Sequence, residues 1–264
     1  MTAPPPATAL PEPGALPVVD GRYPPDSPTP PDMNATYAPP VAALGDDARA
    51  AFLVRTYTHL LGSILLFAGI EIFLFTSGLA APIAEALLTM PGGWLVVLGG
   101  FVVVSWFASR TAATATSKAA QYGALGAFVL AEAIIFVPLL YIAAFQVGDG
   151  VIGAAAWTTL IGFSVLTAIV FFTGKDFSFL GGLVKWGMGL ALVAIVVGVL
   201  TGFNLGTWFS VAMIGLAGAA ILYDTSKVMN EYPEDRYVAA ALTLFASVAL
   251  MFWYVLRLFM ANRN

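Results

Sequence analysis

The chain has 264 residues, of which 59% are hydrophobic and only 10% are charged, and its formal net charge is −4. Soluble domains carry about 25% charged residues, so this composition excludes an ordinary water-soluble globule and indicates a membrane protein. The absence of cysteine excludes disulfides, thiolate nucleophiles and cysteine metal sites.

The first 45 residues differ sharply in composition from the rest of the chain, because they hold 13 of the 17 prolines and few large apolar residues. Such a segment cannot bury enough surface to offset its ordering entropy. The sequence therefore predicts a disordered, proline-rich cytoplasmic tail over 1–47 and a membrane domain over 48–264. The tail lacks the charged and apolar regions of a signal peptide. A solvated tail is favoured over a docking site for a proline-binding domain.

Seven apolar segments follow, each near the roughly 20 residues that a membrane-spanning helix needs. The expected ranges are 52–75, 92–110, 118–144, 151–173, 181–202, 207–229 and 237–260. Many glycines lie inside them, and small residues let helices pack closely in lipid. The predicted fold class is an all-α polytopic membrane protein, a bundle of seven transmembrane helices.

The distribution of basic residues predicts the orientation of this bundle. With seven crossings and a cytoplasmic N-terminus, nine of the eleven lysines and arginines fall on the cytoplasmic side. Arg257 and Arg263, near the C-terminus, fall on the other side. A re-entrant last segment would return both to the cytoplasmic side, so the sequence leaves that alternative open.

Three acidic residues lie within the predicted spans, where a charge is costly and an acid is a functional candidate. Asp224 lies about 10 Å below the cytoplasmic surface by helical rise, and Lys227, three residues later, is a candidate ion-pair partner. Glu132 lies near the midplane with no basic neighbour in its own helix, so a neutral hydrogen-bonded role and a proton or ion relay are equally open. Glu71, near the far end of the first helix, is expected to reach water and to be structural.

Signatures of catalysis are absent from the sequence. There is no glycine-rich phosphate loop, no histidine-rich metal cluster and no Gly-x-Ser-x-Gly motif. The single histidine, His59, has no companion ligands for a metal, and the tryptophans lie mostly near helix ends, where they anchor at the interface. We therefore expect no enzyme and no nucleic-acid partner.

Three motifs occur in the second half of the chain. They are Lys-Asp-Phe-Ser-Phe-Leu-Gly-Gly at 175–182, Leu-Tyr-Asp-Thr-Ser-Lys at 222–227, and Ala-Leu-Thr-Leu-Phe at 241–245 followed by Tyr-Val-Leu-Arg-Leu at 254–258. Together they resemble the motifs of the Bax inhibitor-1 family. The resemblance spans about residues 50–260, in order and spacing. It implies a seven-helix fold whose last helix is enclosed by the other six. It also implies a pH-responsive calcium leak and, in bacterial members, association with a membrane-bound AAA protease.

The resemblance also implies roles for particular residues. In pH-sensing members an aspartate of the sixth helix pairs with one of the seventh, and an arginine at the end of the second latches onto the first. Asp224 matches the first aspartate and Arg110 the arginine, but Ser247 stands where the second aspartate is expected. The paired sensor is then incomplete, and Glu132 is a hypothetical replacement for the missing carboxylate.

Two functions from different classes follow, with a secondary transporter as a third reading. The first is a passive calcium leak in which Asp224, with hydroxyls such as Thr225 and Ser247, forms a weak, transient calcium site without a resident cofactor. The alternative is a non-conducting regulator of a membrane-bound AAA protease or stress response. Both place a multi-pass protein in the bacterial cytoplasmic (inner) membrane, with the lipid bilayer as its main partner.

Overall fold

The computed structural model describes residues 39–90 and 93–263, and the predicted tail over 1–38 lies outside them. Within the described residues every regular element is a helix, apart from an isolated bridge between Pro40 and Pro233. The end of the predicted tail, residues 39–47, is part of this described structure and already contains the first turn of a long helix.

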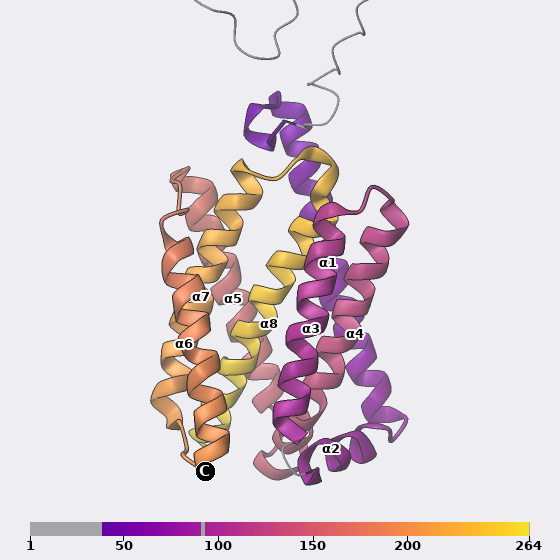
Figure 1. Cartoon of the computed structure of the whole chain (residues 1–264), viewed down its shortest axis with the longest axis vertical. Coiled ribbons are helices and arrows are strands. Elements are labelled where there is room, and N and C mark those ends of the chain that lie inside the picture. Colours follow the sequence, from indigo (N-terminus) through magenta and orange to yellow (C-terminus); the bar gives the residue numbers. More distant parts are fainter. Residues whose placement is uncertain (1–38, 91–92, 264) are drawn as a thin grey trace, which may run out of the picture. The chain divides into compact units, whose positions relative to one another are not determined.

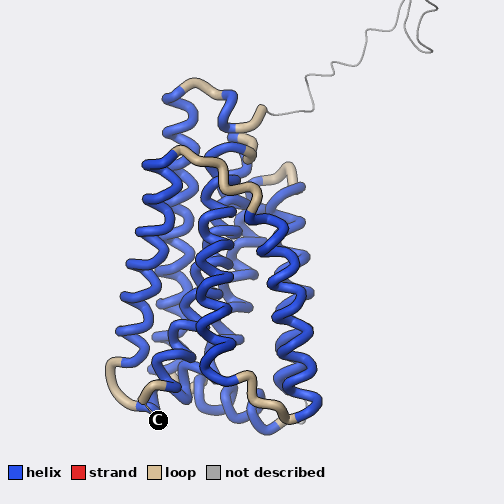
Figure 2. The backbone as a smooth tube through the Cα atoms, turned by 90° about the vertical axis from the view of Figure 1, so that its left-hand side faces the viewer, coloured by secondary structure: helices blue, strands red, loops and turns tan. Residues whose placement is uncertain are grey.

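Seven helices of more than 20 residues account for most of the described chain. They are α1 (Asp46–Thr76), α3 (Gly93–Thr114), α4 (Lys118–Ile142), α5 (Val151–Thr173), α6 (Leu180–Thr201), α7 (Gly206–Asn230) and α8 (Tyr237–Ala261). The short elements are η1 (Val41–Ala43), α2 (Ala80–Thr89), η2 (Ala143–Val147) and η3 (Glu234–Arg236). The helices lie side by side with their connections at the two ends (Figure 2).

Six helical segments of the described chain are long and apolar enough to cross a membrane. They contain α1, α4, α5, α6, α7 and α8. Helix α3 covers most of the predicted span 92–110 and packs against α4, but it is not among these six. The multi-pass, all-helical prediction is confirmed, whereas the count of seven crossings is not.

Helix α8 lies at the centre of the bundle, where it packs against α1, α3, α4, α5 and α7 (Figure 1). Its sequence is apolar around the whole circumference, as expected for a helix without a solvated face. Val238, Leu242, Leu244 and Leu256 are at most 2% exposed. The last helix is therefore the core on which the others are arranged.

The C-terminal end of α8 is tied to the connection between α4 and α5, since the Arg263 guanidinium donates to the Asp149 carbonyl over 2.9 Å. Helix α8 is continuous from Tyr237 to Ala261. The structure thus contains no re-entrant turn in this described segment, and the alternative considered for the last hydrophobic segment is wrong. Its two ends lie at opposite ends of the bundle (Figure 1).

Backbone and side-chain hydrogen bonds join three connections at the other end of the bundle. The Val41 amide donates to the Tyr232 carbonyl over 2.8 Å, beside the Pro40–Pro233 bridge. The Arg236 guanidinium donates to the Ala115 carbonyl over 2.7 Å. Because these bonds hold the turn between α7 and α8, they fix the axial position of α7 relative to α8, the helices that carry Asp224 and Ser247.

Close contact between α6 and α7 depends on glycine. A Cβ atom at Gly181 would lie 2.7 Å from the Tyr223 ring, and one at Gly187 would lie 2.7 Å from a Leu216 methyl group. Such distances are not compatible with an added methyl group unless a neighbour moves. The glycines therefore set how closely α6 approaches α7, as small residues do at helix interfaces in lipid.

We predict that Gly181→Ala destabilises the protein by about 1–3 kcal/mol, the usual cost of overpacking, because the new methyl group meets the Tyr223 ring. Thermal unfolding in detergent micelles measures the change. Gly189→Ala is the matched control, since this α6 glycine has open space around its Cβ position. An equal or higher unfolding temperature for Gly181→Ala than for the control would contradict the packing argument.

Candidate functional site

A cavity of about 420 Å³ lies between α8 and helices α3, α4, α6 and α7. Its walls are mostly apolar, and they carry a small number of oxygen-bearing side chains. These are Ser105, Ser109, Glu132, Asp224, Thr243, Ser247 and Tyr254. The cavity therefore brings three of the predicted site residues, Glu132, Asp224 and Ser247, into one space.

Asp224 on α7 and Ser247 on α8 are in direct contact. The Ser247 hydroxyl donates a hydrogen bond to the Asp224 carboxylate, with 2.5 Å between the oxygens. Ser247 is only 6% exposed. The side chain at the position expected for a second aspartate thus does face Asp224, but it supplies a neutral hydroxyl donor instead of a second carboxylate.

Glu132 on α4 is the more buried of the two carboxyl groups of this cavity, with 5% of the residue exposed. Among the described residues no hydrogen bond or ion pair to its carboxyl group is found. A buried polar group without a partner costs free energy, and such groups mark sites with a purpose other than stability. Its position in the wall of the cavity that contains Asp224 makes it the second carboxyl group of the site.

Neither of the two cations expected near Asp224 forms an ion pair with it within the described residues. Lys227 lies 3.9 Å from the Glu231 carboxylate and above the Tyr223 ring, so its ion pair is with the next turn of α7. Arg110 is exposed and stacks over Trp106, with 5.5 Å to the ring centroid. In this structure the Asp224 carboxylate therefore accepts a hydrogen bond from Ser247. No lysine or arginine of the described residues lies within ion-pair distance of it.

Thr225, expected as an additional hydroxyl ligand, does not line the cavity. It is fully buried, and its hydroxyl has no hydrogen-bond partner within the described part of the chain. Successive helical residues are turned by about 100°, so the residue next to Asp224 faces another side of α7. Thr243 and Ser105 take its place in the cavity wall.

The motif at 175–182 has a structural role that the sequence alone did not reveal. The Asp176 carboxylate accepts hydrogen bonds from the Ser178 amide (2.8 Å), the Ser178 hydroxyl (3.0 Å) and the Ser226 hydroxyl of α7 (3.1 Å). The Phe177 amide donates to Ser226 in turn. The bonds from Ser178 and then Ser226 hold the pKa of Asp176 below its usual value, and they fasten the α5–α6 connection to α7.

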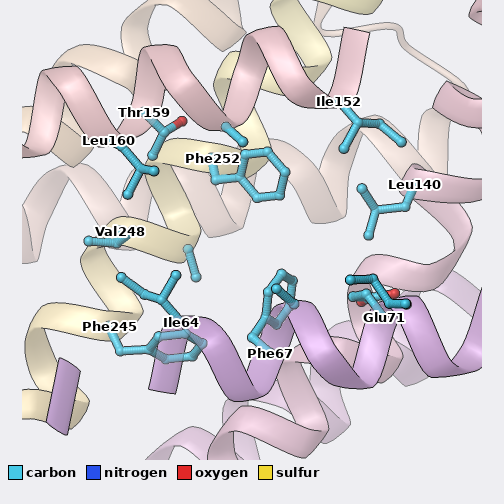
Figure 3. Close-up of a pocket in the computed structure, with 14 residues that line it drawn as sticks. Ile64, Phe67, Glu71, Leu140, Ile152, Thr159, Leu160, Phe245, Val248 and Phe252 are labelled. Carbon is cyan, nitrogen blue, oxygen red and sulfur yellow. The ribbon is translucent and has the colours of Figure 1, made fainter. Parts of the chain in front are cut away.

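A second cavity, of about 260 Å³, lies on the side of α8 that faces α1 and α5 (Figure 3). Glu71 of α1 lines it and is only 7% exposed, and both carboxylate oxygens lack a hydrogen-bond partner among the described residues. The expectation that Glu71 reaches water is wrong. The rotation of α1 in the bundle turns this side chain inward, and an unpatterned apolar helix gives no sequence signal for that rotation.

Large apolar side chains cover the outside of the bundle, among them Trp157, Trp186 and Trp208 at 70–85% exposed. An outer surface of this kind suits lipid and not water. Together with the helix lengths, it defines a polytopic α-helical membrane protein whose central helix has an acid-containing cavity on each of two sides. The chain belongs to the Bax inhibitor-1 family, because the family model described as inhibitor of apoptosis-promoting Bax1 matches residues 49–264.

Bacterial relatives cover most of the membrane domain. The uncharacterized protein PA2604 of Pseudomonas aeruginosa is 28% identical over 190 residues, or 69% of this chain and 81% of the relative. The modulator of FtsH protease YccA of Escherichia coli K12 is 27% identical over 183 residues, or 67% of this chain and 78% of the relative. The inner membrane protein YccA of another Escherichia coli strain matches to the same extent.

We predict that Asp176→Ala speeds hydrogen exchange of the Ser178 and Phe177 amides several-fold, because the carboxylate that organises both bonds is lost. Exchange measured by mass spectrometry resolves this connection. Since the pKa of Asp176 is lowered on folding, its contribution is present above the unfolded pKa of about 3.9 and lost as the pH falls through the folded value. Acidification through the folded pKa, which lies below that unfolded value, should therefore mimic the substitution once the intrinsic exchange rate at each pH is taken into account.

The matched control is Asp149→Ala, which removes an exposed loop aspartate whose side chain has no hydrogen bond among the described residues. Unchanged exchange at Ser178 in Asp176→Ala would refute the anchoring role.

Proposed function

We propose that this protein is a passive pathway for cations, with calcium as the main candidate, and that the cavity containing Asp224 and Glu132 is its intramembrane binding site. The observation that carries the proposal is the presence of two carboxyl groups from different helices in one cavity beside the central helix. Ionisable groups at membrane depth are costly and occur where ions or protons pass.

The composition of the cavity suits weak and transient binding. Calcium prefers six to eight oxygen ligands, and this cavity supplies two carboxyl groups with the hydroxyls of Ser105, Thr243 and Ser247. No group of three or more His, Cys, Asp or Glu side chains suitable for a metal occurs in the described part of the chain. A site with few charged ligands releases its ion readily, as conduction requires.

The short hydrogen bond from Ser247 gives the proposed site a different response to pH from that of an aspartate pair. Two carboxyl groups in direct contact share a proton into the physiological range, whereas Ser247 offers Asp224 a neutral hydroxyl that does not titrate there. We propose that any pH response comes from Glu132, and that Arg110 reaches Asp224 only in another conformation of α3.

We further propose that α3 is the seventh crossing and that residues 1–38 are a disordered cytoplasmic tail, whereas residues 39–47 belong to the described fold. At 1.5 Å per residue, the 22 residues of α3 span about 33 Å, enough for a hydrocarbon core of about 30 Å. With this count the N-terminus is cytoplasmic, in agreement with the distribution of basic residues. The bacterial inner membrane is the proposed location, because one relative is named as an inner membrane protein.

Calcium flux into liposomes that contain the purified protein tests this function. We expect Asp224→Asn to lower the flux about tenfold or more, because the amide lacks the negative charge that attracts the cation. A tenfold change corresponds to ~1.4 kcal/mol. Glu132→Gln should change the dependence of the flux on pH. Glu85→Gln, which alters an exposed acid on α2, is the matched control.

Ser247→Asp completes the experiment, since it places a second carboxyl group against Asp224. Two such groups cannot both ionise freely, so this variant should acquire a steeper response of flux to pH. Flux no greater than in empty liposomes at every pH would rule out the conducting function.

A second candidate function is supported by the described role of a relative. A protein 27% identical over 183 residues is called a modulator of FtsH protease. We propose as the alternative that this chain binds a membrane-bound AAA protease without conducting ions. The turn over 230–236 and the N-terminal tail are the polar segments available for such a partner.

Affinity capture of the full-length chain from bacterial membranes tests the alternative. It predicts that an AAA protease is retained by the wild type and by Asp224→Asn, and that it is lost when residues 1–38 are deleted or the 230–236 turn is replaced. Capture that depends on Asp224, or no capture at all, would speak against an independent regulatory role.

A further inference from the structure

The cavity between α1, α5 and α8 has a different character from the proposed ion site. Of the 14 residues that line it, all of them described, Glu71 is the only ionisable one and Thr159 the only other with a polar side chain. The remaining lining is aliphatic or aromatic, with Phe67, Phe245 and Phe252 as its largest members (Figure 3). This space is therefore suited to an apolar body with a single polar group.

The two polar groups of this cavity are unsatisfied in the described structure. Both Glu71 oxygens and the Thr159 hydroxyl are buried without hydrogen-bond partners. Thr159 on α5 and Glu71 on α1 lie at opposite sides of the cavity (Figure 3). A buried carboxyl group with no partner is expensive to maintain. The Glu71 oxygens lie behind the apolar wall of the cavity, and a ligand that supplies a donor or a cation would remove this cost once the side chain turns them inward.

The cavity opens toward the lipid-facing surface. Two of its lining residues, Ile72 and Leu160, are 64% and 36% exposed. Apolar side chains continue around them on α1 and α5, including Phe73, Trp157 and Ile161. A molecule dissolved in the hydrocarbon of the bilayer can therefore enter between the two helices, whereas a hydrated ion meets an apolar rim.

The size is sufficient for a small amphiphile. An apolar protein cavity of about 150 Å³ holds one benzene molecule, and this one is about 260 Å³. Because the ligand enters from bilayer hydrocarbon, its apolar chain gains packing contacts in the cavity and no hydrophobic free energy. The carboxyl group therefore supplies both affinity and selectivity through a charge-assisted hydrogen bond.

We propose that this cavity binds a membrane-partitioned amphiphilic amine, with its ammonium group paired to Glu71 and its apolar chain against the aromatic side chains of α1 and α8. The carboxyl group and the amine share one dissociable proton, so the pair stays neutral as a whole whichever group holds it. This neutrality allows the complex to form in an apolar cavity. The site is separate from the cavity of Asp224 and does not depend on ion conduction.

Thermal unfolding of the full-length protein in nanodiscs of zwitterionic phospholipid tests the proposal, with n-octylamine and n-octanol as probes. A ligand of the folded state raises the unfolding temperature with its concentration. We expect the amine to bind wild-type protein about tenfold or more tightly than the alcohol, because a charge-assisted hydrogen bond is about twice as strong as a neutral one.

Three variants locate the effect. Glu71→Gln should bind both probes equally, because it retains the shape and loses the charge. Ala156→Leu, which fills the cavity from α5, should lose both. Glu85→Gln, an exposed acid on α2, should behave as wild type.

Four results would overturn the proposal. The first is equal affinity of the wild type for the two probes. The second is no shift of the unfolding temperature with either probe, which would also result if a lipid chain already fills the cavity. The third and fourth are a preference for the amine that persists in Glu71→Gln or in Ala156→Leu.

Discussion

The enclosure of α8 by its neighbours is the constraint on which the rest of this structure depends. In a bilayer the hydrophobic effect does not drive helices together, so close packing, small residues and a limited number of polar contacts hold a bundle. An apolar helix with no lipid-facing side must be covered on every side, and five helices pack against α8. Both cavities lie along this helix, where its neighbours do not close completely around it.

The polar side chains of the bundle divide into two kinds with different physical consequences. Asp176, Arg236 and the Val41 amide are satisfied by partners at an end of the bundle and hold its connections in place. Glu132 and Glu71 are buried among apolar side chains without described partners, which costs stability. Buried carboxyl groups such as these are informative about function, because packing of the bundle does not require them.

The same helix serves both cavities through different faces. Ser247 and Thr243 of α8 face the Asp224 cavity, while Phe252 and Val248 face the Glu71 cavity, and Ala249 lines both. A polar, hydroxyl-bearing cavity on one side and an apolar one with a single acid on the other are suited to different ligands, a cation and an amphiphile.

The sequence by itself determined the class of this protein, its family and its candidate acidic residues. Long apolar runs predicted the multi-pass helical class, the order and spacing of three motifs indicated the family, and the rarity of acids at membrane depth singled out Asp224 and Glu132. These inferences are reliable because a bilayer core penalises charge and demands helices of a certain length. The short helix α2 was missed because its 10 residues are too few to span.

Only the tertiary structure decided which way each helix is turned. In a soluble helix the polar face reveals the buried one, but here lipid and protein interior are equally apolar, so rotation about the helix axis leaves no pattern in the sequence. For this reason the sequence could not show that Glu71 points inward, that Thr225 faces away from Asp224, or that Lys227 bonds Glu231. Packing against α8 fixed those rotations, and with them the groups that share each cavity.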